Sequence, residues 1–238
     1  MARKAADGRL DPFQKEFVSL LRDNARRHRV HEVFRDFCEI TAITFSNSMD
    51  RSRYKTREAR HLAVIKRYSR DEVTRFALML AKLTMSLEAG MSDCLGQIFM
   101  ALELGDHWKG QYFTPYEISL LMVRITVVDI EAKLKQEQFV TVNEPAVGAG
   151  GMVIALADAL QVAGINYQES MHVTAQDIDS TAVHMAYIQL SLLGVPAVVI
   201  HGNSLTAKSW DHWLTPMHVI GGWGPKLKRR TRWKEEAA

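Results

Sequence analysis

The sequence predicts a mixed α/β protein in which an α-helical half precedes an open sheet of parallel strands. Before residue 105 the chain has a single proline, and its apolar residues recur at helical spacing. Residues 139–142 then form a β-branched run that leads into a glycine-rich turn and an apolar helix. Two further strand-like runs, at 171–175 and 197–200, alternate with a helical stretch. Such alternation is typical of a doubly wound sheet, in which ligand groups gather at the carboxyl ends of the strands.

The amino-terminal half is predicted to consist of amphipathic helices. Asp11 can cap a first helix with Pro12 in its first turn. A later helix begins near Asp71 and stops at Gly90, and another follows from a Ser92 cap. The aromatic and methionine rows of these helices are expected to form core.

Two runs of positive charge interrupt this half, at 26–29 and 51–57. They could contact a nucleic-acid backbone. The alternative is an ordinary solvated surface, because charge runs often lie on exposed faces.

The composition restricts the class of protein. A hydrophobic content of 47% in 238 residues is enough for a substantial core, and the net charge of +3 means that any basic surface is local. Cys38 and Cys94 form no zinc-ligand pattern with the histidines, so we expect no metal and a reducing, cytoplasmic setting. No segment reaches the roughly 20 apolar residues of a membrane span, and we expect no membrane partner.

The stretch from Phe139 to Met152 carries the clearest chemical signal. A strand ends at Glu144 and Pro145, since proline cannot donate to a sheet, and glycines 148, 150 and 151 form a turn that a ligand can approach closely. The spacing matches neither the dinucleotide motif nor the phosphate loop. An acid before the turn would repel a phosphate but suits an ammonium group, which points to S-adenosylmethionine. The alternative is a turn that only joins a strand to a helix.

A second motif lies at the boundary between the halves, in the turn-rich segment 105–116. Thr114, Pro115 and Glu117 predict a capping box at the start of a helix. The expected buried face of this helix consists of Ile118, Leu121, Met122 and Ile125.

Together these motifs resemble those of the DNA adenine-N6 methyltransferases. Gly110-Gln111-Tyr112-Phe113-Thr114-Pro115 is followed about thirty residues later by Asn143-Glu144-Pro145-Ala146-Val147-Gly148-Ala149-Gly150-Gly151. The modification subunit of type I restriction systems is the nearest match. The resemblance covers residues 110–206 well, and it implies a Rossmann-like, S-adenosylmethionine-dependent methyltransferase sheet after an α-helical domain.

The resemblance also implies a cofactor site. Thr114 and Pro115 would line the methionine end of S-adenosylmethionine, and Glu144 would pair with its amine. The backbone of the glycine turn would pass beneath the cofactor. The implied turn residues are Pro145, Ala146, Gly148 and Gly150.

The other end of the cofactor is assigned to the next two strands. Asp177 would accept hydrogen bonds from both ribose hydroxyls, where the family more often has glutamate, and Ile178 would lie against the adenine. Asn203 stands where the family has an acid that accepts from the adenine amine. Its amide oxygen could accept as well, but without charge.

The catalytic Asn/Asp-Pro-Pro-aromatic motif of the family is absent, because no two of the six prolines are adjacent. A fourth strand is expected at 217–220, and three or four strands are fewer than a complete sheet contains. His218, Asp211 and Trp223 are the nearest polar and aromatic groups to the expected site, and none is a convincing substitute. An unfinished sheet leaves an edge that a protein partner, a second copy or the amino-terminal helices could cover.

Tryptophan is concentrated near the carboxyl terminus, among lysines and arginines. These side chains could stack on bases, or they could pack in the core or at a partner interface. The residues are Trp210, Trp213, Trp223 and Trp233.

The sequence therefore predicts three regions: a helical domain at 1–105, a methyltransferase-like domain at 106–225 and a basic tail at 226–238. The leading hypothesis is an S-adenosylmethionine-binding protein of the DNA adenine methyltransferase family, with DNA and a protein chain as partners. The alternative is a catalytically inactive relative that binds DNA or a partner as a regulator. A truncated remnant of a longer gene is a third interpretation.

Overall fold

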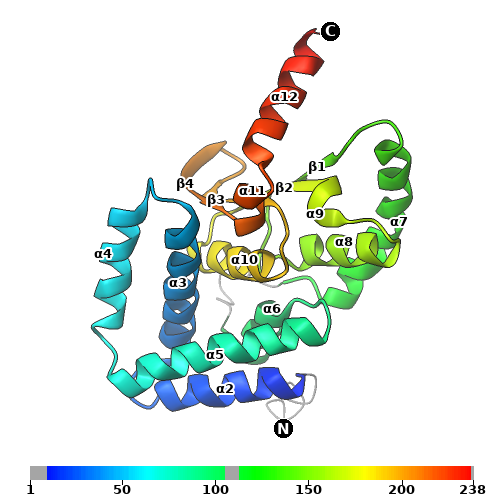
Figure 1. Cartoon of the computed structure of the whole chain (residues 1–238). Helices are drawn as coiled ribbons and strands as arrows, with labels where there is room; N and C mark the ends of the chain where they lie inside the picture. The colour runs from blue at the N-terminus through cyan, green and yellow to red at the C-terminus, as the bar shows by residue number, and fades with distance from the viewer. Residues whose placement is uncertain (1–9, 105–112, 237–238) are drawn as a thin grey trace.

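The computed structural model describes residues 10–104 and 113–236, without the side chains of 126–129 and 232–236 (Figure 1). Helices form the first part of the described chain, and a four-stranded sheet with its own helices forms the second. The helices before the sheet are α2 (Pro12–Asn24), α3 (Val30–Met49), α4 (Tyr54–Ile65), α5 (Arg70–Ala89), α6 (Cys94–Ala101) and α7 (Tyr116–Leu134). The remaining elements are β1 (Val140–Glu144), α8 (Gly151–Val162), α9 (Tyr167–Ser170), β2 (Met171–Asp177), α10 (Ser180–Leu192), β3 (Ala197–Asn203), β4 (Lys208–Leu214), α11 (Pro216–Ile220) and α12 (Trp223–Glu236).

Local signals set the start of α2 and the end of α5 as expected, whereas α6 is capped by Asp93 and not by Ser92. The Oδ1 atom of Asp11 accepts a hydrogen bond from the Gln14 backbone N–H at 2.8 Å, and the Gln14 side chain accepts from the Asp11 N–H at the same distance. This reciprocal pair is a capping box, with Pro12 in the first turn. Helix α5 ends at Gly90 as expected.

The sheet has the order β1-β2-β3-β4, and its first three strands are parallel (Figure 1). Helix α8 connects β1 to β2, and α10 connects β2 to β3. Since crossovers between parallel strands are right-handed, both helices lie on one face of the sheet. Met171, Val173 and Ala175 of β2 are buried there. The predicted α/β class is confirmed.

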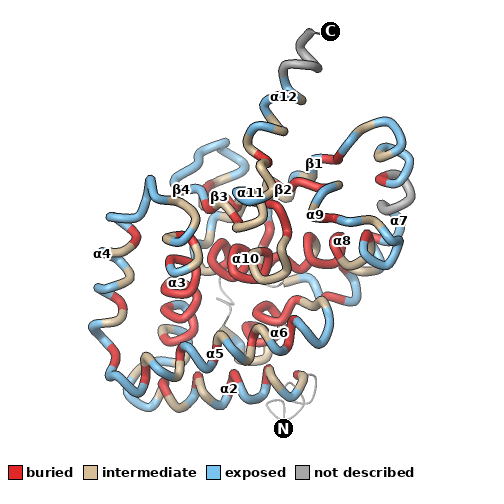
Figure 2. The backbone as a smooth tube through the Cα atoms, viewed as in Figure 1, coloured by how far each residue is buried: buried red, intermediate tan, exposed pale blue. Residues whose placement is uncertain are grey.

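The helical region and the sheet share one hydrophobic core (Figure 2). Helix α3 packs along α10, and α2 packs along α5. Phe17 and Phe37, from α2 and α3, meet edge to face with ring centroids 5.0 Å apart. The amino-terminal helices therefore cover the outer side of α10, beneath the sheet.

The fourth strand is not where the sequence placed it. Residues 217–220 belong to helix α11, and the strand is β4, which runs antiparallel to β3. Thr215 caps α11 and Pro216 occupies its first turn. A short apolar run fits a helix or a strand equally well, so the cap decides between them.

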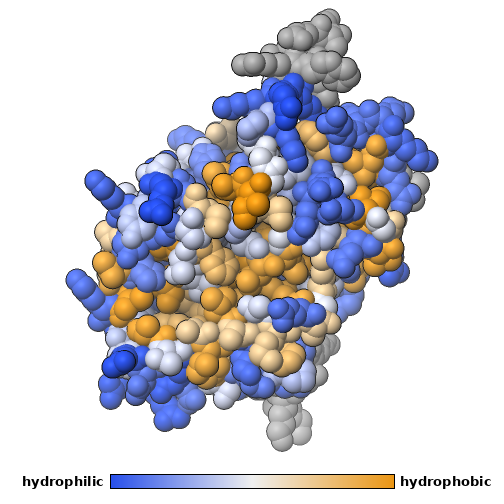
Figure 3. All heavy atoms as spheres, viewed as in Figure 1, coloured by the Kyte–Doolittle hydropathy of each residue, from blue (hydrophilic) through white to orange (hydrophobic). Residues whose placement is uncertain are grey.

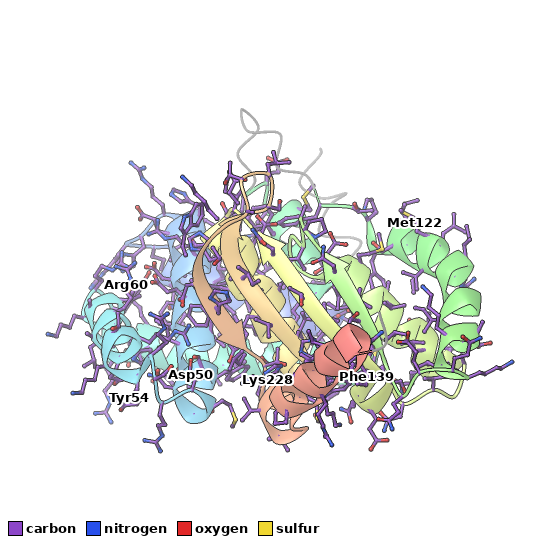
Figure 4. All side chains as sticks on the ribbon, turned by 90° about the horizontal axis from the view of Figure 1, so that it is seen from above. Asp50, Tyr54, Arg60, Met122, Phe139 and Lys228 are labelled. Carbon is purple, nitrogen blue, oxygen red and sulfur yellow. The ribbon has the colours of Figure 1, made fainter. Side chains whose placement is uncertain are left out.

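Helix α7 faces the opposite way from the prediction. Leu121 and Ile125 of the expected buried row are 61% and 76% exposed, while Tyr116 and Val123 are buried. The expected capping box is also wrong, because the helix begins at Tyr116 without a side-chain cap. Figure 4 labels Met122 on this helix, at the margin of the molecule, and Figure 3 shows apolar atoms there. The helix is apolar on several sides, so its packing on α8 decides which side is buried.

The basic tail continues as helix α12, which projects from the sheet (Figure 1). Trp223 at its start is fully buried and meets Phe139 edge to face, with ring centroids 5.0 Å apart. Arg230 forms an ion pair with Glu137, and its Nη1 donates to the Phe139 carbonyl at 2.9 Å. Of the carboxyl-terminal tryptophans, Trp213 and Trp223 therefore pack in the interior, while Trp210 is exposed.

Candidate functional site

The glycine turn connects β1 to α8 as the sequence predicted. Gly148 and Gly150 have φ angles of +55° and +102°, in the left-handed region that favours glycine. A Cβ atom at Gly148 would lie only 2.8 Å from Cδ1 of Phe113. The ring of Phe113 therefore lies against the turn. In this way the described end of the first motif meets the second motif in space; Gly110, Gln111 and Tyr112 lie outside the described residues.

Asp177 joins the end of β2 to this turn. Its Oδ2 accepts a hydrogen bond from the Gly148 backbone N–H at 2.9 Å, and its Oδ1 accepts from the Asp179 N–H at 2.9 Å. Each carboxylate oxygen has a further lone pair, so the group can still accept from a ligand. The structure thus brings together the glycine turn and the acid that the sequence placed in one site.

Glu144 ends β1 beside them. Its Oε1 accepts a hydrogen bond from the Ala146 backbone N–H at 3.2 Å, and its second carboxylate oxygen makes no hydrogen bond within the described residues. Pro145 and Ala146 are exposed on the outer side of the turn. Ile178, directly after β2, is also exposed.

Thr114 and Pro115 line a cavity of about 450 Å³ between α6 and the start of α7. Asp93 and Glu117 are the charged residues of its lining, and both are acids. A cavity with this charge suits a cationic group such as an ammonium or a sulfonium. Burial raises the pKa of the Asp93 carboxyl, although hydrogen bonds from Gln189 and from the Gly96 N–H oppose this shift.

A buried polar network holds the turn from below, and sequence reasoning missed it. The Gln189 amide nitrogen donates to Asp93 Oδ1 and to the Ala149 carbonyl, both at 2.8 Å. The Gln189 amide oxygen accepts from the Leu95 N–H at 2.9 Å. This network ties α10, α6 and the glycine turn together. In the sequence, the sign of this network is a glutamine within the apolar stretch of α10, because a buried amide needs hydrogen-bond partners.

Asn203 lies at the end of β3, two strands away from the glycine turn. Its Oδ1 accepts from the Leu205 N–H at 3.0 Å and from the Thr206 N–H at 3.2 Å. The oxygen expected to meet the adenine amine therefore already stabilises its own loop. Its role toward a cofactor stays a prediction.

The three groups named as nearest to a catalytic site all make structural contacts. The His218 Nδ1 lies 2.8 Å from His172 Nε2, and Trp223 packs on His172. Burial, and then the neighbouring His218, lower the pKa of His172 to about 4. Asp211 forms an ion pair with Arg57 at 3.1 Å. These contacts offer no group to hold a base.

Two other kinds of feature are absent from the described residues. They contain no group of three or more histidine, cysteine, aspartate or glutamate side chains arranged to hold a metal ion. None of their helices combines the length and the apolar character needed to cross a membrane.

Comparisons with known proteins place these motifs in context. Curated proteins give no match. A crystal structure described as a class I S-adenosylmethionine-dependent methyltransferase from Listeria monocytogenes is 13% identical, with a TM-score of 0.44. The match covers 81% of this chain and 54% of that one, so this chain spans about half the length of that protein. The family model for N-6 DNA methylases matches residues 98–234, more than half of the chain. The match includes the glycine turn, Asp177 and the loop at Asn203, and the chain belongs to the N-6 DNA methylase family.

Proposed function

We propose that residues 110–206 form the S-adenosylmethionine-binding part of a DNA adenine-N6 methyltransferase, closest to the modification subunit of type I restriction systems. The observation that carries this proposal is the hydrogen bond from the Gly148 N–H to Asp177 Oδ2. It joins the glycine turn after β1 to the acid after β2, which are the two places where a doubly wound sheet holds a nucleoside cofactor.

The described residues fit such a cofactor in four respects. Asp177 keeps free lone pairs for ribose hydroxyls, and Glu144 has a carboxylate oxygen for an amine. The acidic cavity beside Thr114 suits the cationic methionine end. The glycine turn lets the backbone come close to a ligand. When bound, S-adenosylmethionine would supply the methyl group, and these side chains would orient it.

We infer that the group that receives the base comes from outside residues 1–238. The sequence lacks a paired-proline motif, and the polar groups near the expected site are engaged elsewhere. In addition, β1 lies at the edge of the four-stranded sheet. In a doubly wound sheet the strand before the cofactor turn is an inner strand with neighbours on both sides. A further polypeptide segment pairing with β1 would complete this arrangement.

Calorimetric titration with S-adenosylmethionine tests the cofactor site. We expect binding by the wild-type chain and a loss of affinity in the Glu144→Gln variant, which keeps its shape without its charge. Glu169→Gln is the matched control, because it removes one exposed acid in α9, at the amino end of β2, whereas Glu144 lies at the carboxyl end of β1. An absence of binding by the wild-type chain would reject the proposal.

A second candidate function is that of an inactive, methyltransferase-like regulator. The missing catalytic motif favours it. Transfer of a tritiated methyl group to unmethylated DNA tests the regulator. Transfer by the purified chain that is lost in Glu144→Gln would reject it, while cofactor binding without transfer is expected both of a regulator and of a methyltransferase whose base-receiving group lies on a further polypeptide segment.

A further inference from the structure

A second cleft, of about 450 Å³, lies between helices α3, α4 and α10 and strand β4. We propose that it binds a phosphate group, and that its source is the DNA backbone. The residues of its lining that carry this proposal are Arg35, Arg57, Arg60, His184, His201 and Trp213.

The charge of the cleft is opposite to that of the cavity beside Thr114. The lining has three arginines and two carboxylates, Glu39 and Asp211, and Asp36 and Asp50 behind it also lie 3.5 Å from Arg35 and Arg57. The two carboxylates are neutralised within the cleft. Arg60 holds Glu39 through two hydrogen bonds, and Arg57 holds Asp211 at 3.1 Å. An incoming anion therefore meets no uncompensated acid.

Arg57 forms a rigid floor for the cleft. Its guanidinium lies 3.9 Å from the centre of the Trp213 ring and also donates to the His212 carbonyl at 2.8 Å. Only 5% of Arg57 is exposed, and its Nε has no hydrogen-bond partner among the described residues.

His184 provides the second sign that the cleft binds a ligand. The side chain is 8% exposed and lines the cleft, and its ring meets Trp213 edge to face with centroids 4.9 Å apart. Its Nδ1 has no partner within the described part of the chain. Buried polar atoms normally have a partner, so an unpaired imidazole nitrogen at the wall of a cleft points to a ligand.

The rim of the cleft carries two guanidinium groups, those of Arg35 and Arg60. Arg35 and Arg60 are each about half exposed, and Figure 4 shows Arg60 on α4 at the margin of the molecule. Arg35 lies 3.5 Å from Asp36, but Asp36 is also held by Arg67 and Tyr68, so Arg35 can turn away from it. A guanidinium presents paired N–H groups that match phosphate oxygens.

The position of the cleft favours DNA as the source of the phosphate, an inference that depends on the proposed function. His201 lines the cleft, and its Nε2 lies 3.3 Å from the carbonyl of Ile178. Ile178 follows directly on Asp177, so the cleft adjoins the carboxyl ends of the strands where the cofactor is proposed to bind. A backbone phosphate held here would position a duplex beside that site.

The test compares a variant carrying Arg35→Gln and Arg60→Gln with a control carrying Lys133→Gln and Lys135→Gln. Each removes two exposed positive charges, but the control residues lie at the end of α7. Fluorescence anisotropy with a labelled, unmethylated duplex is recorded at several salt concentrations. We expect weaker binding by the cleft variant alone, with the salt slope lowered by about 0.9 for each lost phosphate contact. Equal loss in both variants, or no loss, would overturn the proposal.

Binding of inorganic phosphate and binding of S-adenosylmethionine distinguish the possible sources of the phosphate, and they separate the cleft proposal from the cofactor proposal. Nuclear magnetic resonance of the wild-type chain with inorganic phosphate should shift the imidazole signals of His184 and His201. If phosphate shifts these signals but the duplex does not bind, the cleft is a phosphate site and the DNA backbone is rejected as the source of the phosphate. If a chain that binds S-adenosylmethionine shows no imidazole shifts and no duplex binding, the phosphate site in the cleft is rejected and the cofactor proposal is unaffected. Failure to bind S-adenosylmethionine would reject the cofactor proposal but would not change the conclusion about phosphate binding in the cleft.

Discussion

Gln189 and Asp93 are 96 residues apart in the sequence, yet the Gln189 amide nitrogen donates to Asp93 Oδ1 at 2.8 Å in the interior. The same nitrogen donates to the Ala149 carbonyl in the glycine turn. The amino-terminal helices and the proposed cofactor site are therefore one structural unit. The turn is thus linked through Gln189 of α10 to Asp93, the N-cap of α6, which lies outside the motif.

Replacement of Gln189 by leucine should weaken both folding and cofactor binding. The change preserves volume but leaves Asp93 and the Ala149 carbonyl without their donor, at a cost of about 1–3 kcal/mol for each unsatisfied buried group. Urea unfolding measures the stability, and calorimetry with S-adenosylmethionine measures the binding. Gln161→Leu, on the exposed end of α8, is the control. A Gln189→Leu chain that is as stable as wild type would contradict this account.

Replacement of Arg57 should detach α4 from the sheet. The guanidinium pairs with Asp211, lies over Trp213 and is almost fully buried. Removal of Arg57 leaves the charge of Asp211 without its partner. We therefore expect Arg57→Met to lower the free energy of unfolding by about 3 kcal/mol. This is the lower end of the range for a buried ion pair, because Asp211 keeps some contact with water. Arg53→Met, exposed just before α4, should change stability by less than about 0.5 kcal/mol. Similar unfolding midpoints for the two variants would refute the anchoring role.

The orientation of α7 can be tested with two isoleucines of the same helix. Ile130 is 6% exposed and Ile125 is 76% exposed. We expect Ile130→Ala to lower the free energy of unfolding by about 2–5 kcal/mol. Ile125→Ala should change it by no more than about 0.5 kcal/mol. Denaturant unfolding of both variants measures the difference. A larger loss for Ile125→Ala would mean that the sequence prediction of the buried face was right.

The His172–His218 pair should make stability depend on pH. Burial lowers the pKa of His172 from 6.5 to about 4, so the folded protein binds fewer protons than the unfolded chain in this range. The contribution of this group is fully present above pH 6.5 and is lost as the pH falls toward 4. His172→Phe should flatten the curve of unfolding free energy between pH 7 and 4.5. His31→Phe, whose histidine is exposed on α3, should leave it unchanged.

Much of the fold could be predicted because its signals are local. The Asp11-Pro12 start of α2, the end of α5 at Gly90 and the end of β1 at Glu144 each depend on a few neighbouring residues. The glycine turn was predictable for the same reason, since its φ angles exclude most other residues. The helical structure of residues 217–220 could not be predicted, because a short apolar run has no unique periodicity.

The sequence by itself determined where the strands β1, β2 and β3 and most helices form, and which family the motifs resemble. Only the tertiary structure decided that Asn203 turns its oxygen to its own loop, that α7 exposes Ile125, and that Gln189 supports the turn through Asp93. Caps, turns and periodicity act between residues a few positions apart, so they can be read along the chain. The partner of a buried amide and the buried side of an apolar helix depend on contacts between distant segments, which exist only once the chain has folded.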